Sequence, residues 1–289
     1  MDPGVWLVHK RAGETSFQHV LAALGPRGRG VCHAGALDPF AHGLLILLAG
    51  QATRLIELMH PIPKEYAAEI AWGAETDNGD PLGKVVAQGD ASRLTAAAID
   101  EALPAFLGWR EQIPPAASNK KIGGEPAYKK FHRGEIVELP PSRVYLHSAR
   151  WLAHDLPRSS RLELVCRGGY YVRALARDLG RMLGARAHLA TLHRTAIGPW
   201  RDPERPEHVT GRGIVPWCRA RVLGEAEKNA VAQGKPIERG TIEPPDWPLP
   251  PGWPDPQAPL RALHGDKLVA LLREEADALR PFANLRGGL

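Results

Sequence analysis

Apolar residues recur along the chain at two spacings, one typical of strands and one typical of helices. Residues 5–8 form a short apolar run that predicts a strand. A helix over residues 17–24 follows, because its apolar positions recur at i, i+3, i+4 and i+7 after a cap at Thr15 or Ser16. A second apolar run at 44–48 predicts another buried segment, so the N-terminal part alternates between the two element types.

Turn residues separate these segments from the next ones. Glycines break the chain at 25–30, and a polar loop covers 32–39. Strict alternation of apolar and polar residues over 64–72 predicts a strand with one buried face. A tight reversal at 76–83, which contains Asn-Gly and Asp-Pro pairs, leads to a strand at 84–87.

The middle of the chain mixes both kinds of element. A helix is expected over 95–107, with Pro104 ending or kinking it, and residues 112–134 are expected to form a basic loop. Residues 161–166 alternate as a strand, and 170–183 show a helical apolar face. The order lacks the repeating βαβ pattern of a doubly wound sheet, so we predict the α+β class.

Composition divides the chain into two parts. From about residue 219 the pattern changes, and 244–259 hold eight prolines in sixteen positions, which predicts a rigid extended segment. We therefore expect a larger domain over 1–218 and a small one over 219–289, in line with a length of 289 residues.

No apolar run approaches the roughly 18 residues that a membrane helix needs, and the N-terminus lacks a signal-peptide pattern. The three cysteines form no C-x-x-C pair and an odd number cannot all pair within the chain. We expect a cytoplasmic protein in a reducing compartment, without structural zinc.

Basic residues are concentrated in the middle third. Lys plus Arg against Asp plus Glu is 8 to 12 over residues 1–109, 20 to 10 over 110–219, and 9 to 10 over 220–289. The net charge of +5 is therefore the sum of −4, +10 and −1. Arginine, whose planar fork suits phosphate oxygens and base edges, supplies 27 of the 37 basic residues, which favours a nucleic-acid partner.

Asp38 is the leading candidate for chemistry. Pro39 biases it toward an extended conformation and fixes the following turn, so the carboxylate would sit on a stiff segment. A purely structural role, in which Asp38 caps a helix that starts at Pro39, is the alternative. A metal site formed by Cys32, His33, Asp38 and His42 is disfavoured, because neighbouring residues of an extended segment point to opposite faces.

Arg173 is the second candidate. It lies in the first turn of the helix predicted at 170–183, just after two glycines and two tyrosines that offer close backbone approach and a stacking face. Arg173, Arg177 and Arg181 recur at helical spacing, which is equally compatible with a solvated helix face.

The stretch His33-Ala-Gly-Ala-Leu-Asp38-Pro-Phe-Ala-His42-Gly-Leu-Leu45 resembles the signature of the bacterial tRNA pseudouridine-55 synthases, the TruB type, whose aspartate is the nucleophile. Further matches follow in the order of that family, over about residues 5–200. They are Lys10 with Gly13, Lys64-Glu65-Tyr66, Thr76-Asp77 with Asp80 and Gly83, Gln112-Ile113-Pro114-Pro115, Gly169 to Arg173, Ala176 to Gly180, Ala187 to Leu189, and Leu192 to Thr195.

Several positions depart from the family pattern. Arg11 and Asn78 replace a proline and a threonine, His132 replaces an arginine, and the stretch after Pro115 keeps only Ser118 and Lys121 of its motif. The differences after Pro115 and at His132 affect the loop expected to contact RNA rather than the expected catalytic residues. The C-terminal residues resemble the small RNA-binding β-barrel of the PUA type, apart from the proline-rich segment.

The resemblance implies a fold and a set of roles. The fold would be a mixed, mainly antiparallel sheet flanked by helices, plus the small PUA-like β-barrel. The catalytic residues would be Asp38, Tyr66 and Arg173, with Arg173 keeping the Asp38 carboxylate ionised. Substrate would be bound by His33, Tyr171, Leu192 and Lys10, the last of which supports the site or contacts phosphate. The RNA backbone would be bound by Lys120, Lys121, Lys129, Lys130 and Arg133.

The implied reaction detaches uracil at N1 and rejoins it through C5, without a redox change, so we expect neither a cofactor nor a metal. Attack at the uracil ring, attack at ribose C1′ and a glycal route all remain open. The expected partner is the T-arm of tRNA, and the protein is expected to act as a monomer without an obligate protein partner. A non-catalytic RNA-binding or tRNA-folding protein is the alternative function.

Overall fold

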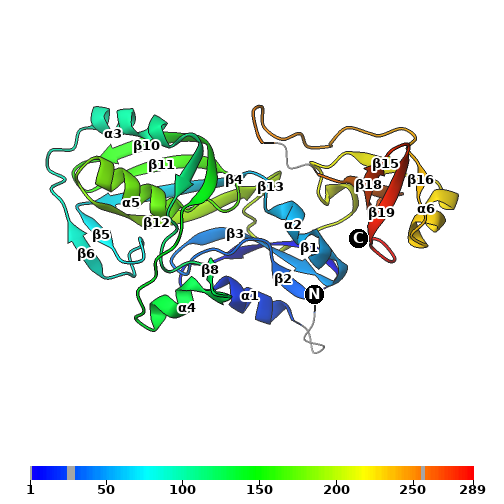
Figure 1. Cartoon of the computed structure of the whole chain (residues 1–289), viewed down its shortest axis with the longest axis horizontal. Helices are drawn as coiled ribbons and strands as arrows, with labels where there is room; N and C mark the ends of the chain where they lie inside the picture. Colours follow the sequence, from blue (N-terminus) through cyan, green and yellow to red (C-terminus); the bar gives the residue numbers. More distant parts are fainter. Residues whose placement is uncertain (1, 25–29, 255–257) are drawn as a thin grey trace. The chain divides into compact units, whose positions relative to one another are not determined.

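The computed structural model describes residues 2–24, 30–254 and 258–289 (Figure 1). The break predicted at 25–30 lies outside the described residues except for Gly30. The chain forms two compact units, each built from separate segments. The first unit contains residues 1–39, 43–62 and 196–289, and the second contains 40–42 and 63–195.

The N-terminal strands of the first unit form an antiparallel group in which β1 lies between β14 and β3, and β2 also pairs with β3. The strand predicted at 5–8 is confirmed as β1, and the apolar run at 44–48 lies within β3. The polar loop predicted at 32–39 is wrong at its start, because Val31–His33 form β2. The strands of this group are β1 (Gly4–Lys10), β2 (Val31–His33), β3 (His42–Ala49) and β14 (Glu207–Val209). The short strand β13 (Trp200–Arg201) pairs instead with the end of β12 (Ala187–Ile197).

Helix α1 (Ser16–Ala23) is capped by Thr15 through a capping box with Gln18. Its predicted apolar face is only half correct, since Val20 is buried whereas Phe17 and Leu21 are 61% and 50% exposed. A 3₁₀ turn, η1 (Gly50–Leu55), and the short α2 (Ile56–Met59) follow β3.

A separate five-stranded sheet forms the C-terminal part, in the order β15-β17-β18-β19-β16. Its curled shape and the helix beside it are consistent with a PUA-like domain, and Figure 1 shows this part in yellow to red. The proline-rich segment has no helix or strand among its described residues. The elements are η3 (Gly211–Gly213), β15 (Ala220–Val222), α6 (Glu225–Ala232), β16 (Ile237–Glu238), β17 (Leu260–His264), β18 (Lys267–Glu275) and β19 (Ala278–Asn284).

The sheet of the second unit follows the order β12-β4-β11-β10-β7, with β11 antiparallel to both β4 and β10. The strands are β4 (Lys64–Trp72), β7 (Gly108–Gln112), β10 (Ser142–Asp155), β11 (Ser159–Cys166) and β12 (Ala187–Ile197). The alternation predicted for β4 is confirmed, because every second residue from Lys64 to Trp72 is buried.

Helix α5 (Val172–Met182) packs on this sheet against β4 (Figure 1). The hairpin of β5 (Ala74–Thr76) and β6 (Val85–Gln88) follows β4, and Pro104 ends α3 (Ala96–Ala102) in the 3₁₀ turn η2 (Leu103–Phe106). The loop expected at 112–134 is partly wrong, since it contains β8 (Lys121–Ile122), β9 (Glu125–Pro126) and α4 (Ala127–His132). The α+β class is confirmed.

Candidate functional site

Asp38 lies in the loop between β2 and β3, and its side chain is half-buried. The chain passes through a turn at Pro39 and Phe40 directly into β3, so the helix-capping role for Asp38 is wrong. The preceding residue is held by one buried side chain. Ser16 Oγ accepts a hydrogen bond from the Leu37 amide at 2.9 Å and donates one to the Leu37 carbonyl at 3.2 Å.

Lys10 holds the other side of the same turn. Its side chain is fully buried, and its Nζ donates to the Pro39 carbonyl at 3.3 Å and to the Arg11 carbonyl at 3.0 Å. The Gly13 amide donates to the same Pro39 carbonyl at 2.8 Å. The ammonium is therefore inaccessible to an RNA phosphate in this structure, and it supports the turn that presents Asp38.

Ser16→Ala is expected to lower kcat for pseudouridine formation, the reaction that the family resemblance implies, by about 10- to 100-fold with little change in KM. The substitution removes both bonds that fix Leu37, and a misplacement of about 1 Å at a reacting group costs on this order. Steady-state kinetics measure the effect. Thr15→Ala is the matched control, because Thr15 caps the same helix through Gln18 and has no bond to the loop. Equal kcat losses in the two variants would contradict the positioning role.

In the second unit, Tyr66 and Lys64 lie on the same buried face of β4, opposite Leu164 and Cys166 of β11. Burial lowers the pKa of Lys64 to about 7, and the positive charge of Arg194 contributes to this shift. Arg194 is itself almost fully buried on β12. The strand that carries Tyr66 therefore runs through a strongly cationic part of the protein interior.

The titration of Lys64 makes stability depend on pH. The pKa of this amine is about 7 when folded and near 10.5 when unfolded, so between these values the unfolded chain binds the extra proton. Stability should therefore rise with pH from about 7 upward, by at most about 1.4 kcal/mol per pH unit. Urea unfolding at pH 7 and pH 9 should show this rise in the wild type and lose it in Lys64→Met. Lys235→Met, at an exposed lysine, should keep it.

Arg173 is buried in the first turn of α5, contrary to the solvated helix face considered above. Its Nη1 donates to the Asn78 carbonyl at 2.6 Å and its Nη2 to the Ala117 carbonyl at 2.9 Å. A Cβ on Gly79, which has a φ of +78°, would lie 3.2 Å from the Arg173 Cβ. Two loops that are far apart in the sequence thus fix the direction of one guanidinium.

Gln112 fixes the start of the same helix. Its buried side-chain amide accepts a hydrogen bond from the Tyr171 amide at 2.9 Å and donates one to the Tyr171 carbonyl at 3.0 Å. Gln112 and Ser16 thus act alike, because each binds both backbone polar groups of one residue. For Ser16 this residue is Leu37, next to Asp38, and for Gln112 it is Tyr171, itself a candidate that lies two residues before Arg173. The patterns along the sequence did not single out either side chain for this role, although Gln112 lies in a matched family motif.

The remaining site candidates, Leu192 and His33, lie on strands of the two units. Leu192 is buried on β12, and the neighbouring His193 stacks on His42 with ring centroids 4.5 Å apart. His33 ends β2 and is half-buried. Among the described residues, no group of three histidine, cysteine or acidic side chains has the geometry to hold a metal ion.

The predicted basic loop has many of its charges compensated locally. Arg133 donates to Glu125 and Glu135 at 2.7 Å, and Lys130 lies 3.4 Å from Glu135. These carboxylates raise the pKa of Arg133 further above its usual range. No ion pair involves the other three lysines within the described part of the chain, so they are the better candidates for phosphate contact: Lys120, Lys121 and Lys129.

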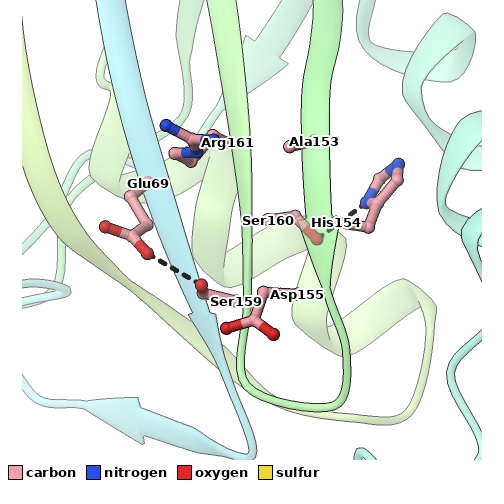
Figure 2. A pocket seen from close by; sticks show the side chains of 7 residues that line it. All are labelled: Glu69, Ala153, His154, Asp155, Ser159, Ser160 and Arg161. Atoms are coloured by element: carbon pink, nitrogen blue, oxygen red, sulfur yellow. Dashed lines mark hydrogen bonds between the residues drawn. The ribbon is translucent and has the colours of Figure 1, made fainter.

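A pocket of about 380 Å³ lies at the end of the β10–β11 hairpin, and none of the candidate residues lines it (Figure 2). It is lined by a serine-histidine pair, with His154 Nδ1 2.8 Å from Ser160 Oγ. Ser160 is almost fully buried and also accepts a hydrogen bond from Trp72 Nε1 at 2.9 Å. The pair therefore joins three strands and is not an accessible nucleophile.

The fold of this chain is similar to that of chains in two solved structures. A chain in the crystal structure of a Cbf5-Nop10-Gar1 complex superposes with a TM-score of 0.66 at 20% identity, covering 98% of this chain and 84% of that chain. A structure of an H/ACA RNP bound to a substrate RNA gives 0.65 at 18% identity, covering 97% of this chain and 84% of that chain. The protein therefore has a pseudouridine synthase fold.

The sequence comparison is more specific. Residues 26–172 match the profile described as TruB family pseudouridylate synthase, N-terminal domain, and the chain belongs to this family. The tRNA pseudouridine synthase B of Symbiobacterium thermophilum is 43% identical over 202 residues, which span 68% of this chain and 67% of that protein. The corresponding protein of Xanthomonas campestris is 41% identical over 202 residues, 70% of this chain. The matched region spans 65% of the length of this relative.

No helix among the described residues is long and apolar enough to cross a membrane.

Proposed function

We propose that the protein is a tRNA pseudouridine synthase that converts the T-loop uridine to pseudouridine, with Asp38 as the nucleophile. The observation that carries this proposal is the rigid presentation of Asp38. Backbone atoms on both sides of it are fixed by Ser16, Lys10 and Gly13, as a reacting group requires. The curated relatives carry the name of this activity.

Asp38 attacks the nucleoside and the bond between N1 and C1′ breaks. The base then rotates and rejoins C1′ through C5, and the bond to Asp38 breaks, which returns its electron pair to the carboxylate. The proton that C5 then loses is taken by a base, for which Tyr66 is our candidate, and N1 ends protonated, so atoms balance without a co-reactant. Arg173 is our candidate for the cation that keeps the carboxylate of Asp38 ionised, a role that the family resemblance implies, since a nearby positive charge favours the charged form.

The target uridine is stacked within a folded RNA loop and must be flipped out, which costs a few kcal/mol. Tyr66 stacks on the flipped base, Tyr171 and Leu192 line its pocket, and His33 stacks in the space that the base leaves. The C-terminal sheet and the lysines at 120, 121 and 129 extend the RNA contact. We propose a monomer acting on the T-arm of tRNA.

Incubation of an unmodified tRNA transcript with the protein, followed by mapping of pseudouridine, tests the proposal. We expect one new pseudouridine, in the T-loop. Tight binding of the transcript without conversion would instead identify a non-catalytic RNA-binding protein. Conversion should persist in the presence of a chelator.

A further inference from the structure

An exposed aromatic residue with an unusual group of arginines lies on β7, the edge strand of the second unit. Trp109 remains 39% exposed. It pairs across the sheet with Tyr145 of β10, and their rings lie 5.2 Å apart at a tilt of 50°. The guanidinium of Arg143 stands 4.5 Å from the centre of the Trp109 ring, and that of Arg167 stands 5.9 Å from it.

Strand register explains why these side chains meet. Arg143 and Tyr145 alternate with the buried Val144 and Leu146 on β10, so both point to the opposite face from the core. Trp109 lies directly opposite Tyr145 and therefore shares that face. Arg167 follows the end of β11, and its amide donates to the Tyr145 carbonyl at 3.0 Å.

Many arginines of the second unit are paired with a carboxylate, whereas those of this group have no such partner in the part of the molecule that the structure describes. Six other arginines each have a carboxylate partner within 3.2 Å: Arg133, Arg150, Arg158, Arg177, Arg181 and Arg186. In contrast, no carboxylate in the described part of the chain forms an ion pair with Arg143 or Arg167, although Glu111 lies opposite Arg143 in the strand register. The buried Nε of Arg167 also finds no hydrogen-bond acceptor among the described residues.

An exposed indole with stacked guanidinium groups suits an unpaired nucleotide as its ligand. An exposed indole offers a stacking face to any unpaired base, and a guanidinium stacked on the indole keeps its N–H edge available to phosphate oxygens. A base within a duplex is already stacked on both sides and gains little from such a face. The positive charges of the two guanidinium groups attract the RNA backbone.

We propose that Trp109 and Arg143, assisted by Arg167, form a platform for one unpaired nucleotide of the bound RNA, outside the catalytic pocket. The base stacks on Trp109 and the phosphate is bound by Arg143. This inference rests on the proposed function only in taking tRNA as the RNA. It adds a second contact that neither the candidate site nor the basic loop provides.

Direct binding measurements test the platform. The dissociation constant for unmodified tRNA should rise about 5- to 100-fold in Trp109→Ala, because one base-aromatic stack is lost, and recover largely in Trp109→Phe. In Arg143→Ala, the slope of log Kd against log salt concentration should fall by about 1, as expected when one phosphate contact is lost. Arg158→Ala is the control, since the partner of Arg158 is Asp155 and it lies outside the platform.

Two outcomes would overturn the proposal. One is a dissociation constant within twofold of wild type in Trp109→Ala and Arg143→Ala. The other is a fall in Tm without a change in tRNA affinity, which would show that the stack only protects the sheet edge. Pseudouridine formation by the wild type is measured in parallel. Weak binding in the variants with no conversion by the wild type would support the platform and refute the catalytic function.

Discussion

Asp38→Asn should abolish pseudouridine formation, lowering kcat by at least about 10⁴-fold, while tRNA still binds within about threefold of the wild-type affinity. Loss of a covalent nucleophile typically has effects of this size. The bonds that fix the loop engage backbone atoms of Leu37 and Pro39, so the amide should occupy the same place as the carboxylate. Single-turnover assays on a T-arm transcript measure the chemical step, and anisotropy measures binding.

Asp90→Asn provides the matched control, because Asp90 is an exposed aspartate that caps a turn through Ser92. It should behave as the wild type in both assays. Retention of a tenth or more of wild-type activity in Asp38→Asn would show that another group starts the reaction. A simultaneous loss of tRNA binding and thermal stability would show instead that the aspartate is structural.

Much of the fold could be predicted because its signals are local. The alternation over 64–72 and the helical face over 172–182 report burial directly, and Pro104 marks the end of α3 in any context. The long strand β10 gave no such signal, since most of its residues are partly exposed and its bulges interrupt the alternation. Helix α4 is short and lies among glycines, so tertiary contacts decide it.

The candidate site was likewise predictable only where its signals are local in the sequence. A motif identifies Asp38 because the residues around it are contiguous, whereas the two side chains that fix the backbone next to it and next to Arg173 are remote. Ser16 is 21 residues from Leu37, and Gln112 is 59 residues from Tyr171. Arg173 itself fitted an exposed helix face equally well until its two carbonyl partners, from residues 78 and 117, were seen.

Arg173→Lys should lower kcat by about 10²- to 10³-fold although it conserves the charge. The planar fork of arginine donates to the Asn78 and Ala117 carbonyls at once, and a lysine ammonium on a flexible stem cannot reproduce that geometry. Each carbonyl left without a partner in the interior costs about 1–3 kcal/mol, so Tm should fall as well. Arg173→Gln, which removes the charge, should also shift the acid limb of the kcat/KM profile to higher pH.

The shift in pH separates an electrostatic role from a structural one, because a loosened loop lowers the rate at every pH, whereas an absent cation raises the pKa of the carboxyl group that must be ionised. Arg177→Lys controls for the helix, since Arg177 lies one turn further along α5 and binds Asp178 and the Ile113 carbonyl. A kcat loss in Arg173→Lys no larger than that in Arg177→Lys would remove Arg173 from the catalytic set. If the acid limb is unshifted in Arg173→Gln, Arg173 has no electrostatic role and only joins the two loops that carry its carbonyl partners.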